Sequence, residues 1–193
     1  MRLFVAVCPP VEAVNHLGAQ IARLRVGAAA AAGARVRLVD PADLHLTLAF
    51  LGDVETVRLV DVESALGLAA EHFRDGRSAA PRLSLGGGGL FGQGRRTVLW
   101  VDVRGDVEAL HELARLVRER LDEAGLPCDE KPFRPHLTVA RAGDRLDLAD
   151  AEADRVTLGD YAGPEWPATD LLLMRSQLGA GRPRYERLAA WPL

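Results

Sequence analysis

The chain has 193 residues, of which 48% are hydrophobic and 26% charged, and its formal net charge is −3. This length predicts one or two small domains with a core that needs no disulfide or metal to hold it together. The small negative charge excludes a general polyanion-binding protein. Any contact with nucleic acid must therefore come from a local group of arginines.

The cysteine pattern and the hydropathy predict a cytoplasmic protein. Cys8 and Cys128 are far apart and form no C-x-x-C motif, so we expect neither a disulfide framework nor cysteine ligation of a metal. The apolar segment 3–7 is too short for a signal-peptide core and ends at two prolines, which favours a first strand. No stretch approaches the roughly 20 apolar residues that a membrane-spanning helix requires.

Apolar periodicity predicts the elements of the first half. In chain order they are a buried strand at 2–7, a helix at 10–25, a flexible Ala/Gly connection at 26–34, a strand at 36–39, a strand that ends near 51–52, and a helix at 54–70. The Ala/Gly run at 26–34 could also extend the preceding helix, but Gly27 and Gly33 favour a flexible connection.

The second half repeats strand and helix signals. We expect a loop at 74–80, a strand at 82–85, a strand at 97–103, a helix from Asp106 as N-cap to Gly125, an acidic surface segment at 144–154, and closing strands at 155–158, 170–177 and 185–191. Four glycines at 86–89 lack the lysine and hydroxyl residue of a P-loop, so we interpret them as a turn or bulge.

Two short segments carry the chemistry: His45-Leu46-Thr47-Leu48 and His136-Leu137-Thr138-Val139. Both alternate like strands. Strict alternation sends Leu44, Leu46, Leu48 and Phe50 to one face of the first strand, and His45, Thr47 and Ala49 to the other. Each strand then presents an imidazole and a hydroxyl side by side.

A single H-x-T motif arises easily by chance, but the two copies share their surroundings. Each follows a proline, Pro41 or Pro135, and each lies downstream of a strand and a helix, the strands at Phe4 and Trp100 preceding their histidines by 41 and 36 positions. A duplicated, pseudo-twofold unit would bring two imidazoles and two hydroxyls together. Such a set suits metal-free displacement at phosphorus, because histidine titrates near neutral pH.

These motifs resemble those of the 2H phosphoesterase superfamily, and within it the RNA 2′,3′-cyclic phosphodiesterases, also known as 2′-5′ RNA ligases. The resemblance covers nearly the whole chain and is carried by residues 1–6, 43–52, 98–101, 132–141, 173–176 and 184–186. It implies an α+β fold with two antiparallel sheets lining a V-shaped cleft. It also implies that residues 1–193 form a single bilobal domain of two pseudo-symmetric lobes.

The resemblance further implies hydrolysis of an RNA-terminal 2′,3′-cyclic phosphate to a 2′-phosphate. His45 would be the proton donor, His136 the proton acceptor, and Thr47 and Thr138 would bind phosphate oxygens. The expected partner is RNA or a nucleotide with a cyclic phosphate end. No cofactor, no metal and no membrane contact is expected, and the predicted oligomeric state is a monomer.

Arg141, five positions after His136, has two open roles. Its charge would disfavour protonated His136 and so keep that ring neutral as a base, or it would bind the phosphate in a bidentate manner, and the two roles are compatible. Arg134 either lines the cleft or is solvated. For Phe4 and Trp100, core packing is favoured over base stacking.

The remaining histidines, His16, His72 and His111, lie in helical segments without partner threonines, and we interpret them as ordinary surface or boundary residues.

Two other functions stay open at this stage. The same histidines would serve the reverse reaction, in which a cyclic phosphate is joined to a 5′-hydroxyl, although water favours hydrolysis. A non-catalytic RNA-end binder predicts the loss of one histidine, and both are present.

Overall fold

The computed structural model describes residues 1–34, 36–129, 131–141, 148–178 and 183–193. Its α-helices are α1 (Val11–Ile21), α2 (Arg25–Ala31), α3 (Leu59–Arg74), α4 (Val107–Glu123) and α5 (Leu148–Gly159), and its 3₁₀ helices are η1 (Pro41–Asp43), η2 (Thr56–Arg58) and η3 (Gly94–Arg96). Its strands are β1 (Arg2–Val7), β2 (Arg37–Leu38), β3 (Leu46–Asp53), β4 (Arg82–Phe91), β5 (Val98–Gly105), β6 (His136–Arg141), β7 (Trp166–Pro167), β8 (Asp170–Leu178) and β9 (Pro183–Pro192).

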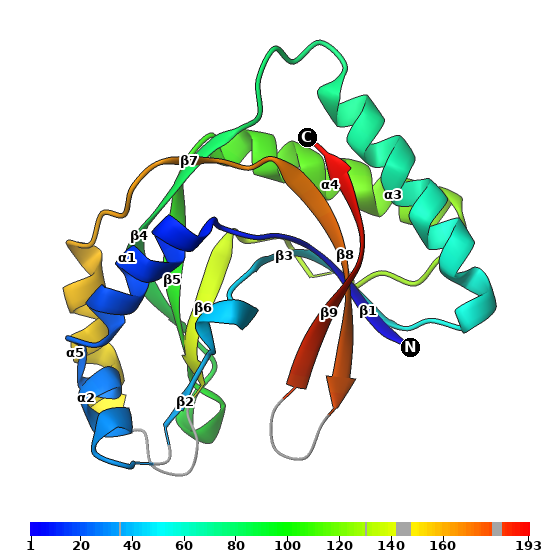
Figure 1. The fold of residues 1–193 in the computed structure, drawn as a ribbon. Coiled ribbons are helices and arrows are strands. Elements are labelled where there is room, and N and C mark those ends of the chain that lie inside the picture. The colour runs from blue at the N-terminus through cyan, green and yellow to red at the C-terminus, as the bar shows by residue number, and fades with distance from the viewer. Residues whose placement is uncertain (35, 130, 142–147, 179–182) are drawn as a thin grey trace.

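The strands form one antiparallel sheet. Their order is β7-β4-β5-β6-β3-β1-β8-β9, with β2 added beside β6. The two halves meet between β3 and β6, where one pair of residues, Leu46 and Leu137, is in register. The two predicted sheets are therefore joined into a single curled sheet of nine strands within the described ranges (Figure 1).

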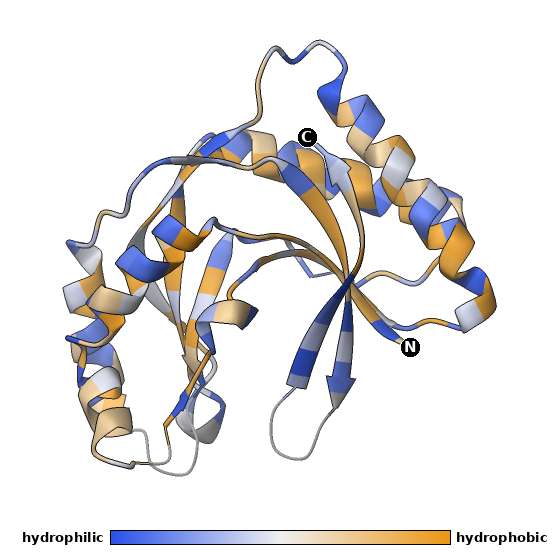
Figure 2. Cartoon of the chain, in the orientation of Figure 1, coloured by the Kyte–Doolittle hydropathy of each residue, from blue (hydrophilic) through white to orange (hydrophobic). Residues whose placement is uncertain are grey.

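Helices cover the convex side of both halves. α3 and α4 lie side by side over β3, β8 and β9, whereas α1 and α5 contact β4 in the other half (Figure 1). Two helices pack on the half opposite to the strand that precedes them. α1 follows β1 but contacts β4, and α4 follows β5 but contacts β3. One continuous apolar core fills the space between sheet and helices. Figure 2 shows the apolar residues along these inner surfaces and hydrophilic free ends of β8 and β9.

Most strand predictions are confirmed. The first strand, both H-x-T strands and the closing strands at 170–177 and 185–191 correspond to β1, β3, β6, β8 and β9. The glycine run lies inside β4, where the register against β5 shifts between Leu85 and Gly88. Gly87 has a φ of 88°, a conformation that glycine adopts without strain. The predicted bulge is thus present.

The flexible connection predicted at 26–34 is wrong, because Arg25–Ala31 form helix α2. Its N-terminus is held by a distant side chain: the Asp154 carboxylate accepts hydrogen bonds from the backbone N–H groups of Arg25 and Val26, both at 2.8 Å. These bonds satisfy two of the donors that a helix start leaves open. Sequence periodicity cannot reveal a cap that lies 128 residues away.

One prediction near residue 150 is wrong and another is confirmed in part. The acidic segment at 144–154 is predicted to lie at the surface: its described part starts at Leu148, where exposed residues accompany the buried Ala151 and Asp154, and residues 144–147 lie outside the described residues. The strand predicted at 155–158 belongs to helix α5, because Ala151, Asp154 and Leu158 recur at helical spacing and are all buried.

Helix boundaries differ from the prediction in α1 and α3. α1 ends at Ile21, and α3 starts at Leu59 because β3 and η2 include the preceding residues. Asp106 is the N-cap residue of α4 as predicted, but its side chain makes no capping hydrogen bond; its carboxylate accepts from the Arg82 backbone N–H at 2.8 Å instead. The predicted stop at Gly125 is confirmed, with a φ of 62°.

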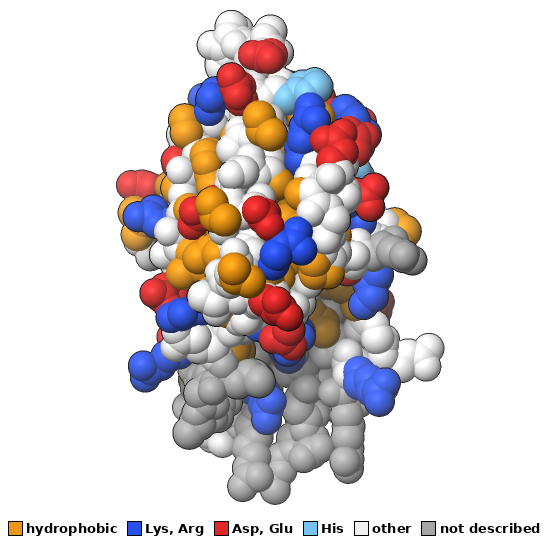
Figure 3. Space-filling view, turned by 90° about the vertical axis from the view of Figure 1, so that its right-hand side faces the viewer, with side chains coloured by type: hydrophobic (Ala, Val, Ile, Leu, Met, Phe, Trp, Pro, Cys, Tyr) orange, Lys and Arg blue, Asp and Glu red, His pale blue; other side chains and the backbone are white. Residues whose placement is uncertain are grey.

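The surface carries mixed charge. Figure 3 views the side on which α3 lies in Figure 1, and it shows acidic and basic side chains interspersed with hydrophobic ones. No broad basic face is visible there, as the net charge predicted. Within the described ranges, every helix is too short or too polar to span a membrane.

The Asp154→Ala variant should be less stable by about 2–3 kcal/mol, because two backbone donors at the start of α2 lose a charged acceptor. For a chain of this size the melting temperature should fall by roughly 5–10 °C in a thermal scan. Asp150→Ala is the matched control, since it removes an exposed ion pair with Arg25 and should change stability by less than about 0.5 kcal/mol. Equal melting temperatures for the two variants would contradict the capping role.

Candidate active site

The two H-x-T strands have the same burial pattern. In His45–Phe50 and His136–Arg141, the histidine and threonine are half-buried, the residues between and after them are buried, and the sixth residue is exposed. Leu46 and Leu137 point into the core at the one position where β3 and β6 pair. The neighbouring histidines and threonines consequently project from the opposite face, which we call the histidine face.

A β-bulge interrupts both strands at the same place. Opposite β1, Ala6 pairs with Thr47 whereas Phe4 pairs with Phe50, so residues two apart face residues three apart. Opposite β5, Trp100 pairs with Thr138 whereas Val98 pairs with Arg141. The extra residues are Leu48 and Val139.

The bulges change which side chains reach the histidine face. Directly opposed residues in an antiparallel pair project from the same face, so Phe50 and Arg141 share the face of the histidines and threonines. The predicted placement of Phe50 beside Leu46 and Leu48 is wrong, because that prediction assumed unbroken alternation. The Phe50 side chain is 51% exposed.

Backbone carbonyls fix both imidazoles in the same way. Nδ1 of His45 lies 2.6 Å from the Asp43 carbonyl oxygen, and Nδ1 of His136 lies 2.7 Å from that of Arg134. A carbonyl can only accept, so Nδ1 carries the hydrogen in each ring and Nε2 of the neutral ring keeps its lone pair. Each histidine therefore offers Nε2 for proton transfer.

Aromatic rings support both histidines. The ring centroid of His45 lies 4.8 Å from that of Phe4 and 5.1 Å from that of Tyr185. That of His136 lies 4.9 Å from that of Phe91 and 5.9 Å from that of Trp100. Phe4 and Trp100 are each 2% exposed, which confirms that they are packing residues.

The glycine run of β4 makes room for this support. A Cβ on Gly89 would lie 1.9 Å from Cζ2 of Trp100, far inside van der Waals contact. Any other residue at position 89 would displace the indole ring, which packs against His136 and stacks on Phe91 at 4.9 Å. The run thus serves packing beneath the site, as an alternative to a phosphate cradle.

Burial is the main influence on His45. It lowers the pKa of His45 below 6.5, the hydrogen bond to the Asp43 carbonyl opposes this, and the charges of Arg141 and His136 lower the pKa further. The two histidines and Arg141 therefore lie within electrostatic reach of one another.

Burial also lowers the pKa of His136, and the Arg134 carbonyl opposes it. The charges of Arg134 and Arg141 lower this pKa further, and the Asp102 carboxylate raises it. Arg141 thus acts on His136 as predicted. Because it lowers the pKa of His45 too, its charge alone does not distinguish an acid from a base.

The structure places Asp102, Tyr185 and Phe91, for which the sequence predicts no role, around the histidines, and it places Arg134 beside them. Asp102 pairs directly with His136 across β5 and β6. The Arg134 guanidinium lies 4.5 Å from the centre of the Trp100 ring. A single carboxylate within an otherwise apolar strand could have indicated a functional role for Asp102. Nothing in the sequence alone indicates that Tyr185 and Phe91 lie beside the histidines, because their positions depend on strand pairing.

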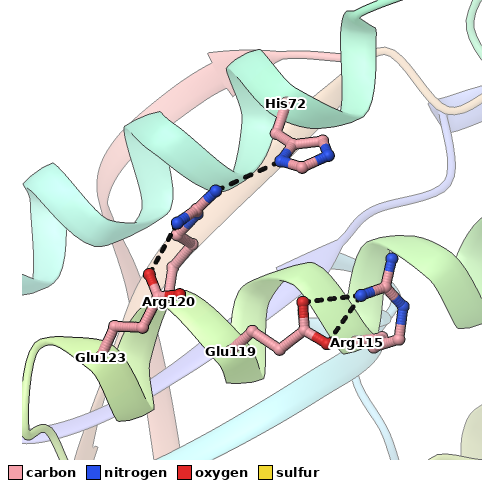
Figure 4. A network of polar contacts seen from close by, with 5 residues as sticks. All are labelled: His72, Arg115, Glu119, Arg120 and Glu123. Atoms are coloured by element: carbon pink, nitrogen blue, oxygen red, sulfur yellow. Dashed lines mark hydrogen bonds and ion pairs between the residues drawn. The ribbon is translucent and has the colours of Figure 1, made fainter.

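The other three histidines lie on helices and make local contacts. His16 Nδ1 is 3.0 Å from the Tyr161 hydroxyl, the His111 ring packs on Phe133, and His72 contacts Arg120 at 3.2 Å (Figure 4). All three histidines are exposed, which confirms their interpretation as surface residues. Among the described residues, no group of three or more His, Cys, Asp or Glu side chains is arranged to hold a metal ion.

The sequence matches named relatives. An RNA 2′,3′-cyclic phosphodiesterase of Thermus thermophilus is 32% identical over 200 residues, covering 100% of this chain and 90% of the relative. An RNA 2′,3′-cyclic phosphodiesterase of Escherichia coli is 32% identical over 161 residues, which cover 81% of this chain and 80% of the relative. One of Geobacillus stearothermophilus is 34% identical over 158 residues, and this chain spans 47% of its length.

Solved structures share the fold. The crystal structure of TT0787 of Thermus thermophilus has a TM-score of 0.71 at 30% identity and covers 100% of this chain and 98% of its own. Escherichia coli LigT complexed with 3′-AMP has a TM-score of 0.71 at 28% identity, with coverage of 100% and 97%. The curled sheet with two H-x-T strands is that of the 2H phosphoesterases. The model of the 2′-5′ RNA ligase superfamily matches residues 9–180, and the chain belongs to that family.

Gly89→Ala should destabilise the protein by about 1–3 kcal/mol, because the added methyl group collides with the Trp100 ring. The NMR signals of the His136 ring should shift as well, since the indole packs against it. Gly18→Ala in α1 is the control: nothing lies within 4 Å of the added Cβ, and stability should rise by about 0.5–1 kcal/mol. A Gly89→Ala variant as stable as the parent would show that β4 and the indole can separate freely.

His45 and His136 should both titrate below pH 6.5 in the free protein. Arg141→Gln should raise the pKa of both rings because a fixed positive charge is removed. NMR titration of the ring protons measures both. Since the unfolded chain binds these protons more tightly, the free energy of unfolding should fall as the pH drops below about 6.5. A shift of His136 alone would place Arg141 too far from His45 to act on it.

Proposed function

We propose that this protein hydrolyses RNA-terminal 2′,3′-cyclic phosphate to a 2′-phosphate, without a metal, by acid–base catalysis with His45 and His136. The observation that carries the proposal is the matched pair of imidazoles, each tied at Nδ1 to the carbonyl two residues earlier and each free at Nε2 on one face. Curated relatives are named RNA 2′,3′-cyclic phosphodiesterase, and this supports the choice of substrate.

In the proposed reaction, a water oxygen attacks phosphorus in line with the bond to the ribose 3′ oxygen. Nε2 of neutral His136 takes the proton from the water as the new P–O bond forms. The bond from phosphorus to the 3′ oxygen breaks, and protonated His45 gives its Nε2 proton to that oxygen. The products are a 2′-phosphate and a 3′-hydroxyl. Proton exchange with solvent then returns both rings to their starting states.

Thr47, Thr138 and Arg141 are the proposed phosphate ligands. Both hydroxyls project beside the histidines, and the bulge at Val139 brings Arg141 to the same face. A guanidinium can donate two parallel hydrogen bonds to phosphate oxygens and can stabilise the charge that builds up during attack. This keeps both predicted roles of Arg141, since one positive charge serves binding and also lowers the pKa of the histidines.

Asp102 supports the assignment of His136 as the base. Its carboxylate faces His136 across the strand pair and raises the pKa of that ring. It would stabilise the imidazolium that forms when His136 accepts a proton from water. The equivalent position in the first lobe is Cys8, which directly follows β1, since Val7 pairs with Leu46 as Val101 pairs with Leu137. Burial raises the pKa of the Cys8 thiol to about 11, so that group carries no negative charge at neutral pH. The carboxylate therefore favours proton uptake at His136.

The proposed substrate is held by both halves of the chain. One continuous core and a shared sheet link them, and the two H-x-T strands repeat in sequence, burial and bulge position. We therefore infer that the two lobes form one pseudo-symmetric domain. Each lobe would contribute one histidine and one threonine to the same phosphate.

The test is to incubate the protein with an oligonucleotide ending in a 2′,3′-cyclic phosphate, in the presence of EDTA, and to identify the product. A 2′-phosphate should form. His45→Ala and His136→Ala should each lower kcat by about 10²- to 10⁴-fold, the usual contribution of a positioned acid or base. His72→Ala, on the outer face of α3, is the matched control and should retain full activity.

Other outcomes of this experiment point elsewhere. A 3′-phosphate product would mean that the 2′ oxygen, and not the 3′ oxygen, is the leaving group. An unchanged rate in His45→Ala or His136→Ala would contradict the two-histidine mechanism. The name of the family favours ligation as a second activity. It is checked by adding an RNA with a 5′-hydroxyl end and looking for a joined product.

A further inference from the structure

Two arginines stand directly opposite each other where β2 joins β6. Arg37 pairs with Arg141 in the antiparallel register, and the next pair is Leu38 with Ala140. Ala140 is buried and Leu38 packs against the core, so the two arginines project from the other face, which is the histidine face. Both arginines belong to the exposed residues. Arg37 is therefore a second guanidinium beside Arg141, and the sequence predicts no role for it.

This like-charged pair is unfavourable in the free protein. Directly opposed side chains in a sheet have Cβ atoms about 4.5–5.5 Å apart, and like charges at such positions are destabilising. Elsewhere in the sheet, Arg175 lies opposite Glu186 and forms an ion pair with it. Among the described residues, neither Arg37 nor Arg141 forms an ion pair with a carboxylate. Anions bound at the two guanidiniums would offset their repulsion.

The position of Arg37 indicates which anion it would meet. Thr138 lies level with His45 on the histidine face, and the next level along β6 holds Arg141 with Arg37 beside it. β5 occupies one edge of β6, so β2 and β3 both lie along the other edge (Figure 1). Arg37 is consequently on the same side of β6 as His45. In the proposed reaction His45 protonates the ribose 3′ oxygen, which places the ribose on this side too.

The phosphate that precedes the terminal nucleotide suits Arg37. The ribose that bears the cyclic phosphate is joined through its 5′ oxygen to the preceding phosphodiester, so one nucleotide separates the two phosphates. Arg37 lies one level beyond His45, and successive residues on one face of a strand are about 7 Å apart. A guanidinium on the ribose side is therefore placed to donate hydrogen bonds to that phosphodiester.

Contacts with the second lobe fix the position of Arg37. β2 follows α2, whose first turn is held by the Asp154 carboxylate of α5. Just after β2, the Val39 backbone N–H donates to the Val139 carbonyl at 2.9 Å. The Ala/Gly run thus forms a helix that leads the chain to the edge of β6. Because the backbone of β2 is held on both sides, Arg37 needs little ordering when a ligand binds.

We propose that Arg37 binds the phosphodiester that precedes the terminal nucleotide, so that the protein acts on RNA ends in preference to cyclic mononucleotides. This rests on the proposed function and deepens it, because it names the substrate class. Arg141 would hold the cyclic phosphate, and each guanidinium would then face its own anion. The contact carries no base preference, since phosphate groups hold no sequence information.

The experiment compares two cyclic substrates, one with and one without a preceding phosphodiester. Arg37→Gln should lower kcat/KM for the dinucleotide ApA ending in a 2′,3′-cyclic phosphate by about tenfold, because a charge-assisted hydrogen bond is lost. Adenosine 2′,3′-cyclic phosphate lacks the second phosphate, and its hydrolysis should stay within about twofold of the parent rate. Arg37→Lys should recover most of the loss, since the charge is kept.

The matched control is Arg23→Gln, which removes the same charge in the groove between α1 and α5. It should behave like the parent on both substrates. The melting temperature of free Arg37→Gln should rise, because a like-charged pair is removed.

The salt dependence of binding gives a second readout that needs no turnover. For a single strand, each neutralised phosphate contributes about −0.7 to the slope of log affinity against log salt concentration. The slope for binding of ApA with a 2′-phosphate, measured by calorimetry, should therefore become less negative by about 0.7 in Arg37→Gln. Binding of adenosine 2′-monophosphate should keep the slope of the parent.

Two outcomes would overturn the assignment. Equal losses of kcat/KM on both substrates would place Arg37 on the cyclic phosphate together with Arg141. An unchanged rate with the dinucleotide would show that the preceding phosphodiester does not contact Arg37. If the parent protein hydrolysed neither substrate, the proposed function would fail, and the binding measurement would still decide whether Arg37 contacts a phosphate.

Discussion

One pair of residues, Leu46 and Leu137, is the constraint on which the rest of the structure depends. They are the one pair in register between β3 and β6, and both side chains are buried. Antiparallel pairing at this point sets Thr138 level with His45 and His136 level with Thr47 on the opposite face. In each motif a leucine stands between the histidine and the threonine. Because these two leucines pair and are buried in one core, the two histidines, 91 positions apart in the sequence, are brought together.

The bulges at Leu48 and Val139 give this duplicated backbone its variety. In an unbroken strand the residue five positions after each histidine would face the core. With one extra residue it faces the histidines instead. Equivalent positions of the two lobes can therefore carry different side chains while the strand pairing stays the same. Phe50 corresponds to Arg141 in this way, and Ala6 corresponds to Trp100.

The sequence was informative where structure is local. Alternation in the H-x-T segments, the apolar stripe of α4 and the closing strands at 170–177 and 185–191 were all predicted, because each depends on spacing within one segment. The bulges were not predicted, since a bulge is defined by the partner strand. Helix α2 was missed for a similar reason: its Ala/Gly composition favours a flexible chain, and a carboxylate from α5 stabilises its first turn. The site residues that alternation alone misplaced, Phe50 above all, follow from the same partner dependence.

The electrostatics of the site bear on how an acid and a base can coexist there. Burial lowers the pKa of both histidines, and each positive charge nearby lowers it further, so the free site favours two neutral rings. A general acid needs a proton. An anionic phosphate beside the rings favours the imidazolium form and offsets the effect of Arg141. The Asp102 carboxylate raises the pKa of His136, so in the proposed reaction it would stabilise the charge that His136 gains on taking up a proton. At His45 the substrate would supply the negative charge, and this would couple protonation of the proposed donor to binding of the phosphate.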